Sequence, residues 1–152
     1  MQLLFVCTGN TCRSAMAEAI AQKLIGNNTE TYQDFSVDSA GVMCAGPSPA
    51  SQNAIITAEQ NGCDLSTFTA KQITAPLLEQ ADYVFAMTRG HKQMLMQMAP
   101  QYSDKVFLLN AYAESNPDAA DIPDPYGGSL LEYQQCFSVL EHSIRQVLEK
   151  LK

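Results

Sequence analysis

One short stretch near the start of the chain, VCTGNTCRSA (residues 6–15), places a cysteine and an arginine in the spacing C-x5-R. A deprotonated cysteine is a nucleophile, and it is stabilised by a helix N-terminus or a neighbouring arginine. The planar guanidinium of an arginine can bind two oxygens of a phosphate group at once. Cys7 and Arg13 at opposite ends of a tight loop would therefore aim a thiolate at the phosphorus of a phosphate bound between them.

The residues of this loop favour a phosphate-binding turn. Gly9 and Asn10 tolerate left-handed backbone conformations, so that successive backbone N–H groups can point inward. The loop leads from an apolar run into a helix, whose N-terminal end attracts anions. The nucleotide-type sequence G-x-x-x-x-G-K-[ST] is missing. The predicted phosphate-binding residues are Thr8, Gly9, Asn10, Thr11, Cys12 and Ser14, and the hydroxyl of Ser14 can also donate to the thiolate.

A leaving-group acid is expected in the stretch DIPDPYGG (residues 121–128). Thiolate attack on a phosphate ester needs a group that protonates the departing atom. Asp124 stands between two prolines that stiffen the loop on both sides, and Asp121 is the competing candidate. From spacing alone, a proline-bracketed aspartate is as often a simple turn residue. Tyr126 could flank a substrate ring or anchor the loop.

The elements that must position these residues alternate along the chain. Apolar or alternating runs predict four strands, at residues 3–7, 35–41, 82–87 and 105–109. Helices are expected at residues 14–25, 49–61, 74–80 and 90–98, and from the capping box at 129–132 to the C-terminus. The acidic stretch 110–128, rich in proline and glycine, is predicted to be a loop. This order indicates an α/β fold: a three-layer domain whose parallel sheet has helices on both faces.

In such a sheet, right-handed crossovers place the first strand near the middle, and ligands bind beyond the carboxyl ends of the strands. The phosphate-binding loop follows the first strand at such an end. The sequence thus predicts a single domain over residues 1–152 with its site at that edge of the sheet.

Composition and charge narrow the function further. The chain has 152 residues, of which 46% are hydrophobic, enough for a substantial core. Its net charge of −7 disfavours binding to nucleic acid or to an anionic membrane. No apolar run approaches the roughly 20 residues of a membrane span, and the first residues do not resemble a signal peptide. The five cysteines are an odd number without a C-x-x-C pair, so we expect reduced thiols in the cytoplasm and no structural zinc.

Together these motifs resemble the low-molecular-weight protein-tyrosine phosphatases. The sequences VCTGNTCRS, SAG at residues 39–41 and DPYG at residues 124–127 occur in the order of that family, and the likeness covers essentially the whole chain. The resemblance implies a four-stranded parallel sheet, no metal and no organic cofactor. It also implies a phosphorylated protein as substrate, and we expect a monomer or a weak dimer.

The resemblance assigns the catalytic roles. Cys7 matches the nucleophile, Arg13 the residue that clamps the phosphate, and Asp124 the general acid. The implied reaction has two steps: Cys7 attacks phosphorus to form a phosphocysteine while Asp124 protonates the leaving group, and water activated by Asp124 then hydrolyses the intermediate.

Supporting roles follow from the same resemblance. Asn10 and Ser39 match residues that hold the loop in a strained shape by hydrogen bonding. Ser14 matches the hydroxyl that steadies the thiolate. Cys12 matches a neighbouring cysteine that can form a reversible disulfide with Cys7.

Position 11 bears on the substrate. Many tyrosine-directed members have an aliphatic residue there, whereas Thr11 resembles the bacterial protein-arginine phosphatase branch, as does AMTRGHKQ at residues 86–93. A hydroxyl on the pocket wall suits a polar guanidinium and could orient water, whereas an aliphatic wall suits a phenol ring. Tyr126 and the prevalence of tyrosine-directed members place phosphotyrosine first, with phosphoarginine as the alternative.

Two other classes fit less well. An arsenate reductase with the same loop needs a resolving cysteine pair near the end of the third strand, but residues 80–98 contain no cysteine. A phosphate-binding module without activity would be expected to lack Cys7 or Asp124. Among the remaining residues, His91 and His142 are predicted to be surface or packing residues, and the methionines at 94, 96 and 98 to fill the core in part.

Overall fold

A parallel four-stranded sheet forms the middle of the molecule in the computed structural model, which describes residues 1–152. The strands are β1 (Gln2–Cys7), β2 (Ser36–Gly41), β3 (Tyr83–Ala86) and β4 (Val106–Leu108). Their order across the sheet is β2-β1-β3-β4, so that β1 pairs with β2 on one side and β3 on the other. The predicted parallel sheet with the first strand inside it is confirmed.

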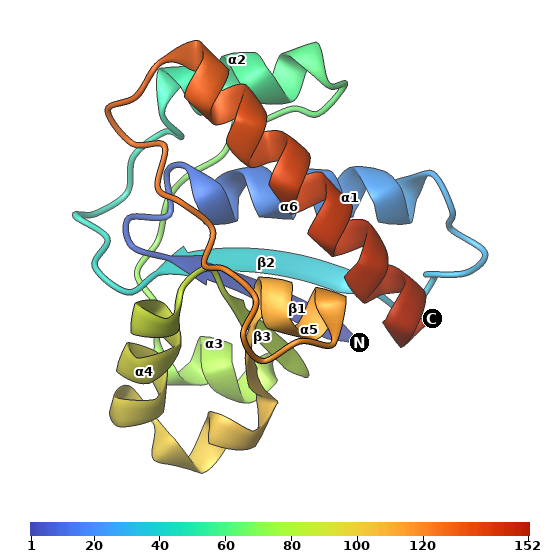
Figure 1. Cartoon of the computed structure of the whole chain (residues 1–152), viewed down its shortest axis with the longest axis vertical. Helices are drawn as coiled ribbons and strands as arrows, with labels where there is room; N and C mark the ends of the chain where they lie inside the picture. Colours follow the sequence, from blue (N-terminus) through green and yellow to red (C-terminus); the bar gives the residue numbers. More distant parts are fainter.

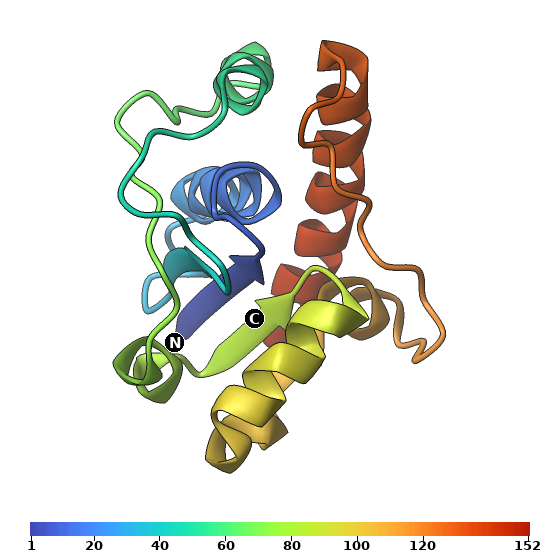
Figure 2. The same cartoon turned by 90° about the vertical axis from the view of Figure 1, so that its left-hand side faces the viewer.

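Helices cover both faces of this sheet (Figure 1). One layer contains α1 (Arg13–Gly26), α2 (Gln52–Gln60), α5 (Leu109–Glu114) and α6 (Leu130–Leu151). The other layer contains α3 (Ala75–Gln80), α4 (Arg89–Met98) and the 3₁₀ helix η1 (Pro100–Lys105). Figure 2 shows α1 and α6 side by side above β1 and β3, with α4 crossing below them. The three-layer arrangement is therefore confirmed.

The side chains of β1 alternate between two cores. Leu3, Phe5 and Cys7 belong to the core under α1 and α6, whereas Leu4 and Val6 belong to the core on the side of α3 and α4. Successive side chains of a strand point to opposite faces, and here both faces are covered. This is why the sequence of β1 is continuously apolar.

Helix α6 begins where the capping box predicts. The hydroxyl of Ser129 accepts a hydrogen bond from the backbone N–H of Glu132 at 3.3 Å. Because its buried residues recur every three or four positions, one side of the helix faces the core. The members of this stripe include Tyr133, Phe137, Leu140, Ile144 and Val147.

The structure differs from the sequence prediction at α2 and at residues 110–128. Helix α2 begins after Ser51 rather than at Pro49, because the chain before it is extended and bonded elsewhere: Ala70 N–H donates to the carbonyl of Ser48, and Ser51 N–H to that of Thr11. The predicted loop at 110–128 contains most of α5, which follows β4 directly and buries Leu109 against the core.

The methionines of α4 are also placed differently. Met94, Met96 and Met98 are 40%, 38% and 47% exposed, so the prediction that they fill the core is wrong. Only His91 and Leu95 of this helix are buried, since α4 meets the sheet along a single narrow face.

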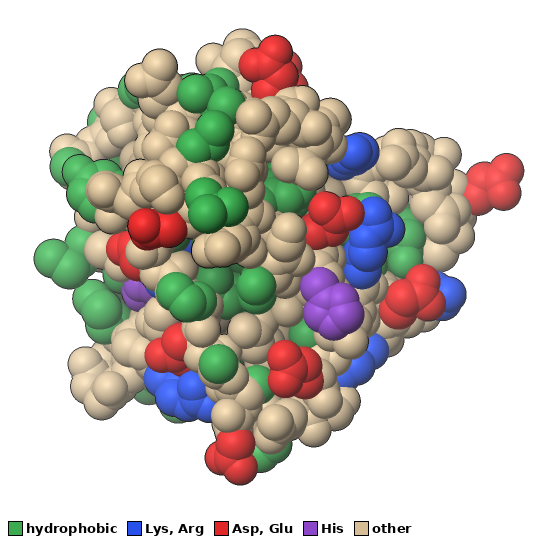
Figure 3. Space-filling model, turned by 45° about the horizontal axis from the view of Figure 1, so that its top comes forward, with side chains coloured by type: hydrophobic (Ala, Val, Ile, Leu, Met, Phe, Trp, Pro, Cys, Tyr) green, Lys and Arg blue, Asp and Glu red, His purple; other side chains and the backbone are tan.

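The outer surface carries charges of both signs. On the face shown in Figure 3, acidic and basic side chains are scattered among one another and do not gather by sign. None of the helices is both long enough and apolar enough to cross a bilayer. No three His, Cys, Asp or Glu side chains converge as metal ligands would.

Candidate active site

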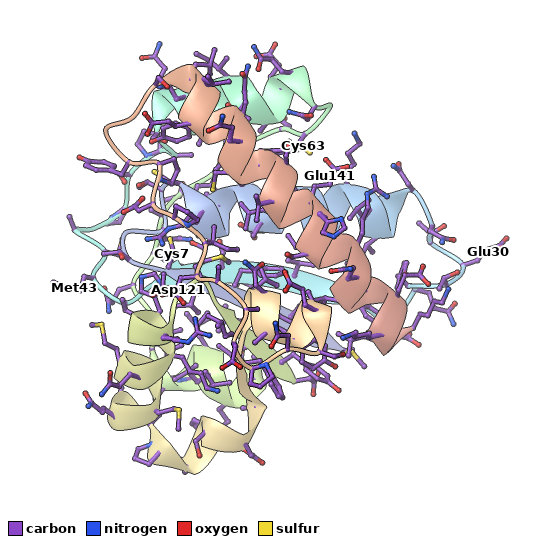
Figure 4. All side chains as sticks on the ribbon, in the orientation of Figure 1. Cys7, Glu30, Met43, Cys63, Asp121 and Glu141 are labelled. Atoms are coloured by element: carbon purple, nitrogen blue, oxygen red, sulfur yellow. The ribbon has the colours of Figure 1, made fainter.

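A cavity of about 320 Å³ opens where β1 ends and the loop before α1 begins. Cys7, Arg13 and Asp124 all line it, so the structure brings together the three predicted catalytic side chains. Thr8, Gly9, Thr11 and Cys12 of the loop, and Tyr126, contribute to the same wall. In Figure 4, Cys7 lies at the carboxyl end of β1, and Met43, which also lines the cavity, lies farther out on the same side.

Asn10 holds the middle of the loop. Its φ is +59°, in the left-handed region, and the residue is fully buried. The side-chain amide donates to Ser14 Oγ at 2.8 Å and to Ser39 Oγ at 2.9 Å, while its oxygen accepts the backbone N–H of Lys71 at 2.9 Å. These three bonds fix an otherwise unfavourable backbone conformation. The positions of Asn10 and Ser39 thus agree with the supporting roles expected for them.

The sulfur of Cys7 lies against a hydroxyl. Ser14 Oγ is 2.9 Å from Cys7 Sγ, and both residues are buried. Asn10 donates to this oxygen and leaves the Ser14 proton free, and once the thiol is ionised the sulfur can only accept that proton. A hydroxyl that donates to sulfur stabilises the ionised form of the thiol. The first turn of α1 begins at Arg13 and adds its positive end to the same place.

Gly41 supports the loop from below, a role that sequence reasoning missed. It is the register partner of Cys7 at the end of β2. A Cβ at this position would lie 2.5 Å from the carbonyl oxygen of Thr8 and 2.9 Å from the backbone nitrogen of Asn10. Only glycine lets β2 approach the loop so closely. The available signal is the SAG sequence, which the family resemblance marks without giving a reason for its glycine.

Arg13 and Asp124 meet at the cavity. Arg13 is buried, and its Nη1 donates to the carbonyl of Ile122 at 2.9 Å. Its Nη2 lies 3.4 Å from Asp124 Oδ2, and the Asp124 side chain is about half exposed. The competing candidate Asp121 instead pairs with Arg89 at 2.9 Å and does not line the cavity. The geometry therefore favours Asp124 as the carboxylate that faces a bound substrate.

His91 is a second residue that sequence reasoning missed. It is buried, and its Nε2 lies 2.8 Å from Thr8 Oγ1 in the phosphate-binding loop. Burial and the nearby charge of Arg13 lower the pKa of His91 to about 4. The imidazole is therefore neutral at neutral pH. Of the two predicted alternatives, a surface or a packing residue, burial agrees with packing, and no sequence signal connects α4 with the loop.

Cys12 lines the cavity and also contacts α6. Its sulfur is 3.2 Å from the hydroxyl of Tyr133 and 3.5 Å from Ser51 Oγ. Burial and the bond to Cys12 raise the pKa of Tyr133 to about 12, so its hydroxyl stays protonated. All five cysteines are free thiols in this structure. A disulfide between Cys7 and Cys12 stays a prediction.

Comparisons with known proteins agree with this geometry. The family model described as low molecular weight phosphotyrosine protein phosphatase matches residues 2–152. The protein-arginine-phosphatase of Bacillus subtilis (strain 168) is 37% identical over 152 residues, which cover 100% of this chain and 97% of the relative. The low molecular weight protein-tyrosine-phosphatase Wzb of Escherichia coli (strain K12) is 31% identical over 149 residues, which cover 98% of this chain and 94% of the relative.

A solved structure extends the agreement to three dimensions. The low molecular weight protein tyrosine phosphatase from T. tengcongensis superposes with a TM-score of 0.91 at 36% identity, and the match covers 99% of each chain. The family match and these relatives span the chain from end to end, and the cavity at the end of β1 contains the cysteine and arginine that such an enzyme needs. The chain belongs to the low molecular weight phosphotyrosine protein phosphatase family.

Proposed function

We propose that this chain hydrolyses phosphotyrosine in proteins through a phosphocysteine intermediate. The observation that carries the proposal is the convergence of Cys7, Arg13 and Asp124 on one cavity, with Ser14 Oγ 2.9 Å from the sulfur. A nucleophile, a phosphate-binding cation and a proton donor are the three groups that this chemistry requires.

In the first step, the thiolate of Cys7 attacks phosphorus. A sulfur–phosphorus bond forms as the bond from phosphorus to the substrate oxygen breaks, and Asp124 gives its proton to that oxygen. Arg13 and the backbone N–H groups of the loop bind the three non-bridging oxygens and stabilise the charge of the transition state. The 3.4 Å contact between Arg13 and Asp124 supports this assignment, because the proposed acid is a neighbour of the residue proposed to bind the phosphate.

In the second step, a water molecule attacks the phosphocysteine. Asp124, now a carboxylate, takes the proton of the water as the oxygen–phosphorus bond forms. The sulfur–phosphorus bond breaks, and the thiolate of Cys7 leaves with the hydrogen bond of Ser14 to stabilise it. Inorganic phosphate then departs, and the enzyme returns to its starting state.

The rim of the cavity supports phosphotyrosine as the substrate. Tyr126 is 75% exposed beside Asp124, and Met43 also lines the cavity. Both present apolar surface that the core does not use, and an aromatic ring stacks well on such surface. A phenol ring that stacks on this surface would have its phosphate in the cavity that Cys7 also lines.

Phosphoarginine is the second candidate substrate. Thr11 lines the cavity with a hydroxyl, which suits a guanidinium better than an aliphatic wall would. The relative from Bacillus subtilis that is 37% identical is itself named a protein-arginine-phosphatase. Phosphoarginine must therefore be tested side by side with phosphotyrosine.

A pair of matched peptides that differ only in phosphotyrosine or phosphoarginine decides the substrate. If phosphotyrosine is the substrate, kcat/KM for that peptide is the larger of the two, and the opposite order assigns phosphoarginine. Thr11→Ile is expected to shift the ratio toward phosphotyrosine by roughly ten-fold, about the worth of one pocket contact. An unchanged ratio would show that Thr11 does not select the substrate. Cys7→Ser is the control and should not turn over either peptide.

We also propose that the enzyme acts in the cytoplasm as a monomer or a weak dimer. A nucleophilic thiol must stay reduced, and all five cysteines are free. Sedimentation at several concentrations in reducing buffer tests the oligomeric state, and a stable higher oligomer would contradict the proposal.

A further inference from the structure

The segment between α5 and α6, orange in Figure 1, carries Asp124 near its end. It has almost no regular secondary structure, and side chains from other elements hold its backbone in place. Their partners are the carbonyl groups of Pro117, Ala119, Ala120 and Ile122. A loop held in this way has a position that depends on a few side chains outside it.

Arg89 makes the largest share of these bonds. It is the first residue of α4, and its Nη2 donates to the carbonyl oxygens of Pro117 at 2.9 Å and Ala119 at 2.7 Å. Its Nη1 and its backbone N–H both donate to Asp121 Oδ1, at 2.9 and 3.1 Å. The carboxylate of Asp121 thus also satisfies a free N–H at the start of a ten-residue helix. In Figure 4, Asp121 lies above this end of α4, on the same side of the molecule as Cys7.

Arg89 bonds to residues 117–121, which come directly before Ile122 and shortly before the proposed acid, Asp124. Ile122 follows Asp121 directly, is fully buried, and donates its N–H to the carbonyl of Met87 at 3.0 Å. Asp124 comes two residues later, after a proline. Without the guanidinium, residues 117–121 would keep one side-chain bond to their backbone from outside the loop, from Asn110 to the carbonyl of Ala120 at 2.8 Å. Ile122 itself would stay bonded to Met87 and Arg13, but the chain that leads into it from Pro117 would be held much less tightly.

We propose that Arg89 is a positioning residue that holds Asp124 at the cavity by tying the segment 117–121 to the start of α4. The inference rests on the proposed role of Asp124 as general acid. Arg89 does not line the cavity around Cys7, so it acts on the acid and not on the bound phosphate. The side chains of Arg89 and Asp121 are 49% and 43% exposed, and exposed ion pairs contribute little to folding stability. We therefore expect the loss of the Arg89 side chain to change the catalytic rate more than the stability of the fold.

The test compares kcat/KM for aryl phosphates whose leaving phenols differ in pKa. A poor leaving group such as phenol needs the acid, whereas 2,4-dinitrophenol leaves without it. Arg89→Ala should lower kcat/KM about ten-fold for phenyl phosphate and less than about two-fold for 2,4-dinitrophenyl phosphate, a part of the 10²–10⁴ that a general acid supplies. Asp124→Asn should show the same pattern more strongly. In the Asp124→Asn background, Arg89→Ala should add less than about two-fold to the loss.

Three further measurements separate positioning from general damage. The inhibition constant of orthovanadate should be unchanged in Arg89→Ala, because the phosphate-binding loop is intact. Arg89→Lys keeps the charge without the planar fork, so it should show most of the loss. Arg145→Ala is the matched control: Arg145 is the other exposed arginine and pairs only with Glu141 on α6, so all rates should stay as in the wild type.

The outcomes distinguish the inference from the function on which it rests. Suppose that Asp124→Asn shows the leaving-group pattern, but Arg89→Ala lowers kcat/KM equally for all substrates or for none. The inference about Arg89 is then wrong, and the assignment of Asp124 as the general acid is kept. If Asp124→Asn shows no such pattern, Asp124 is not the acid, and the inference is overturned with that assignment. Should Arg89→Ala not fold, Arg89→Lys and Asp121→Asn carry the same comparison.

Discussion

Replacing Gly41 with alanine is expected to damage the phosphate-binding loop more than it damages the fold. The new Cβ would lie 2.5 Å from Thr8 O, 2.9 Å from Asn10 N and 2.9 Å from Gly9 C. A carbon and a carbonyl oxygen rest at about 3.3 Å, so one of the two backbones must move by roughly 0.8 Å. All three contacts are with backbone atoms, so no side chain can turn aside to relieve them.

The loop will give way rather than the sheet. β2 is held along its length by its ladder with β1, from Ser36 to Gly41. The loop has no such ladder and is tied by scattered bonds: Met43 N–H donates to Thr8 O, Ser51 N–H to Thr11 O, and the Asn10 side chain bonds to Ser39 and Lys71. A displacement near 1 Å at reacting groups lowers rates by about 10², whereas overpacking of this size costs about 1–3 kcal/mol of stability. We expect kcat/KM for 2,4-dinitrophenyl phosphate to fall about 100-fold in a protein that still folds.

Steady-state kinetics, orthovanadate inhibition and urea unfolding of Gly41→Ala test this expectation. Orthovanadate should bind more weakly, because the backbone donors no longer converge. Gly26→Ala is the control: a Cβ there meets nothing within 4 Å, so activity should be unchanged and stability equal or higher by up to about 1 kcal/mol. Wild-type kinetics and inhibition in Gly41→Ala would refute the reasoning that the close approach shapes the site.

Three more predictions concern groups around the loop. Ser14→Ala removes the hydrogen bond to Cys7 Sγ and should lower kcat by about 10- to 100-fold, the contribution of a hydrogen bond to a charged group. The affinity for phosphate should change little. An unchanged kcat would count against the contact between Ser14 and the thiolate. Asn10→Ala removes three hydrogen bonds, two of them buried, and leaves a non-glycine residue at φ +59°. Urea unfolding should therefore show a loss of about 3 kcal/mol or more, and a loss under about 1 kcal/mol would contradict the network. The pKa of His91 is about 6.5 in the unfolded chain and about 4 in the folded protein, so between these pH values the unfolded chain binds one more proton. The free energy of unfolding should therefore fall by up to about 3 kcal/mol as the pH drops from about 7 to 4. His91→Gln should flatten this slope in urea unfolding at each pH, and an unchanged slope would assign it to other groups.

The nucleophilic half of the site could be predicted because its geometry is local. Cys7 and Ser14 lie within eight residues, and a strand, a tight loop and a helix fix their relation almost without help from the rest of the chain. The same holds for the parallel sheet, since the apolar run of β1 is typical only of a strand covered on both faces. The capping box of α6 is similarly a matter of four neighbouring residues.

The residues that sequence reasoning missed act across long separations. His91 contacts Thr8 from α4, and no neighbour in sequence signals that contact. Gly41 supports the loop from β2, and the SAG motif marks it without indicating what it touches. The start of α2 was misplaced because Ser48 and Pro49 match a helix start locally, while bonds to distant residues keep that segment extended. Helix α5 was missed because its six residues sit next to a stretch rich in proline and glycine, and packing under α6 decides its shape.

Cys7 and Asp124 belong to segments that differ greatly in the free energy of local unfolding. Cys7 ends the strand with a neighbour on each side, whose amides can exchange with solvent only when the whole sheet separates. Asp124 lies near the end of an irregular segment whose backbone is bonded mainly to a few side chains of other elements. Such segments unfold locally at a much lower free energy. Mild denaturant should therefore produce, before global unfolding, a form that still captures phosphate at sulfur but has lost its proton donor, and deuterium uptake at residues 117–124 should precede uptake at residues 3–7.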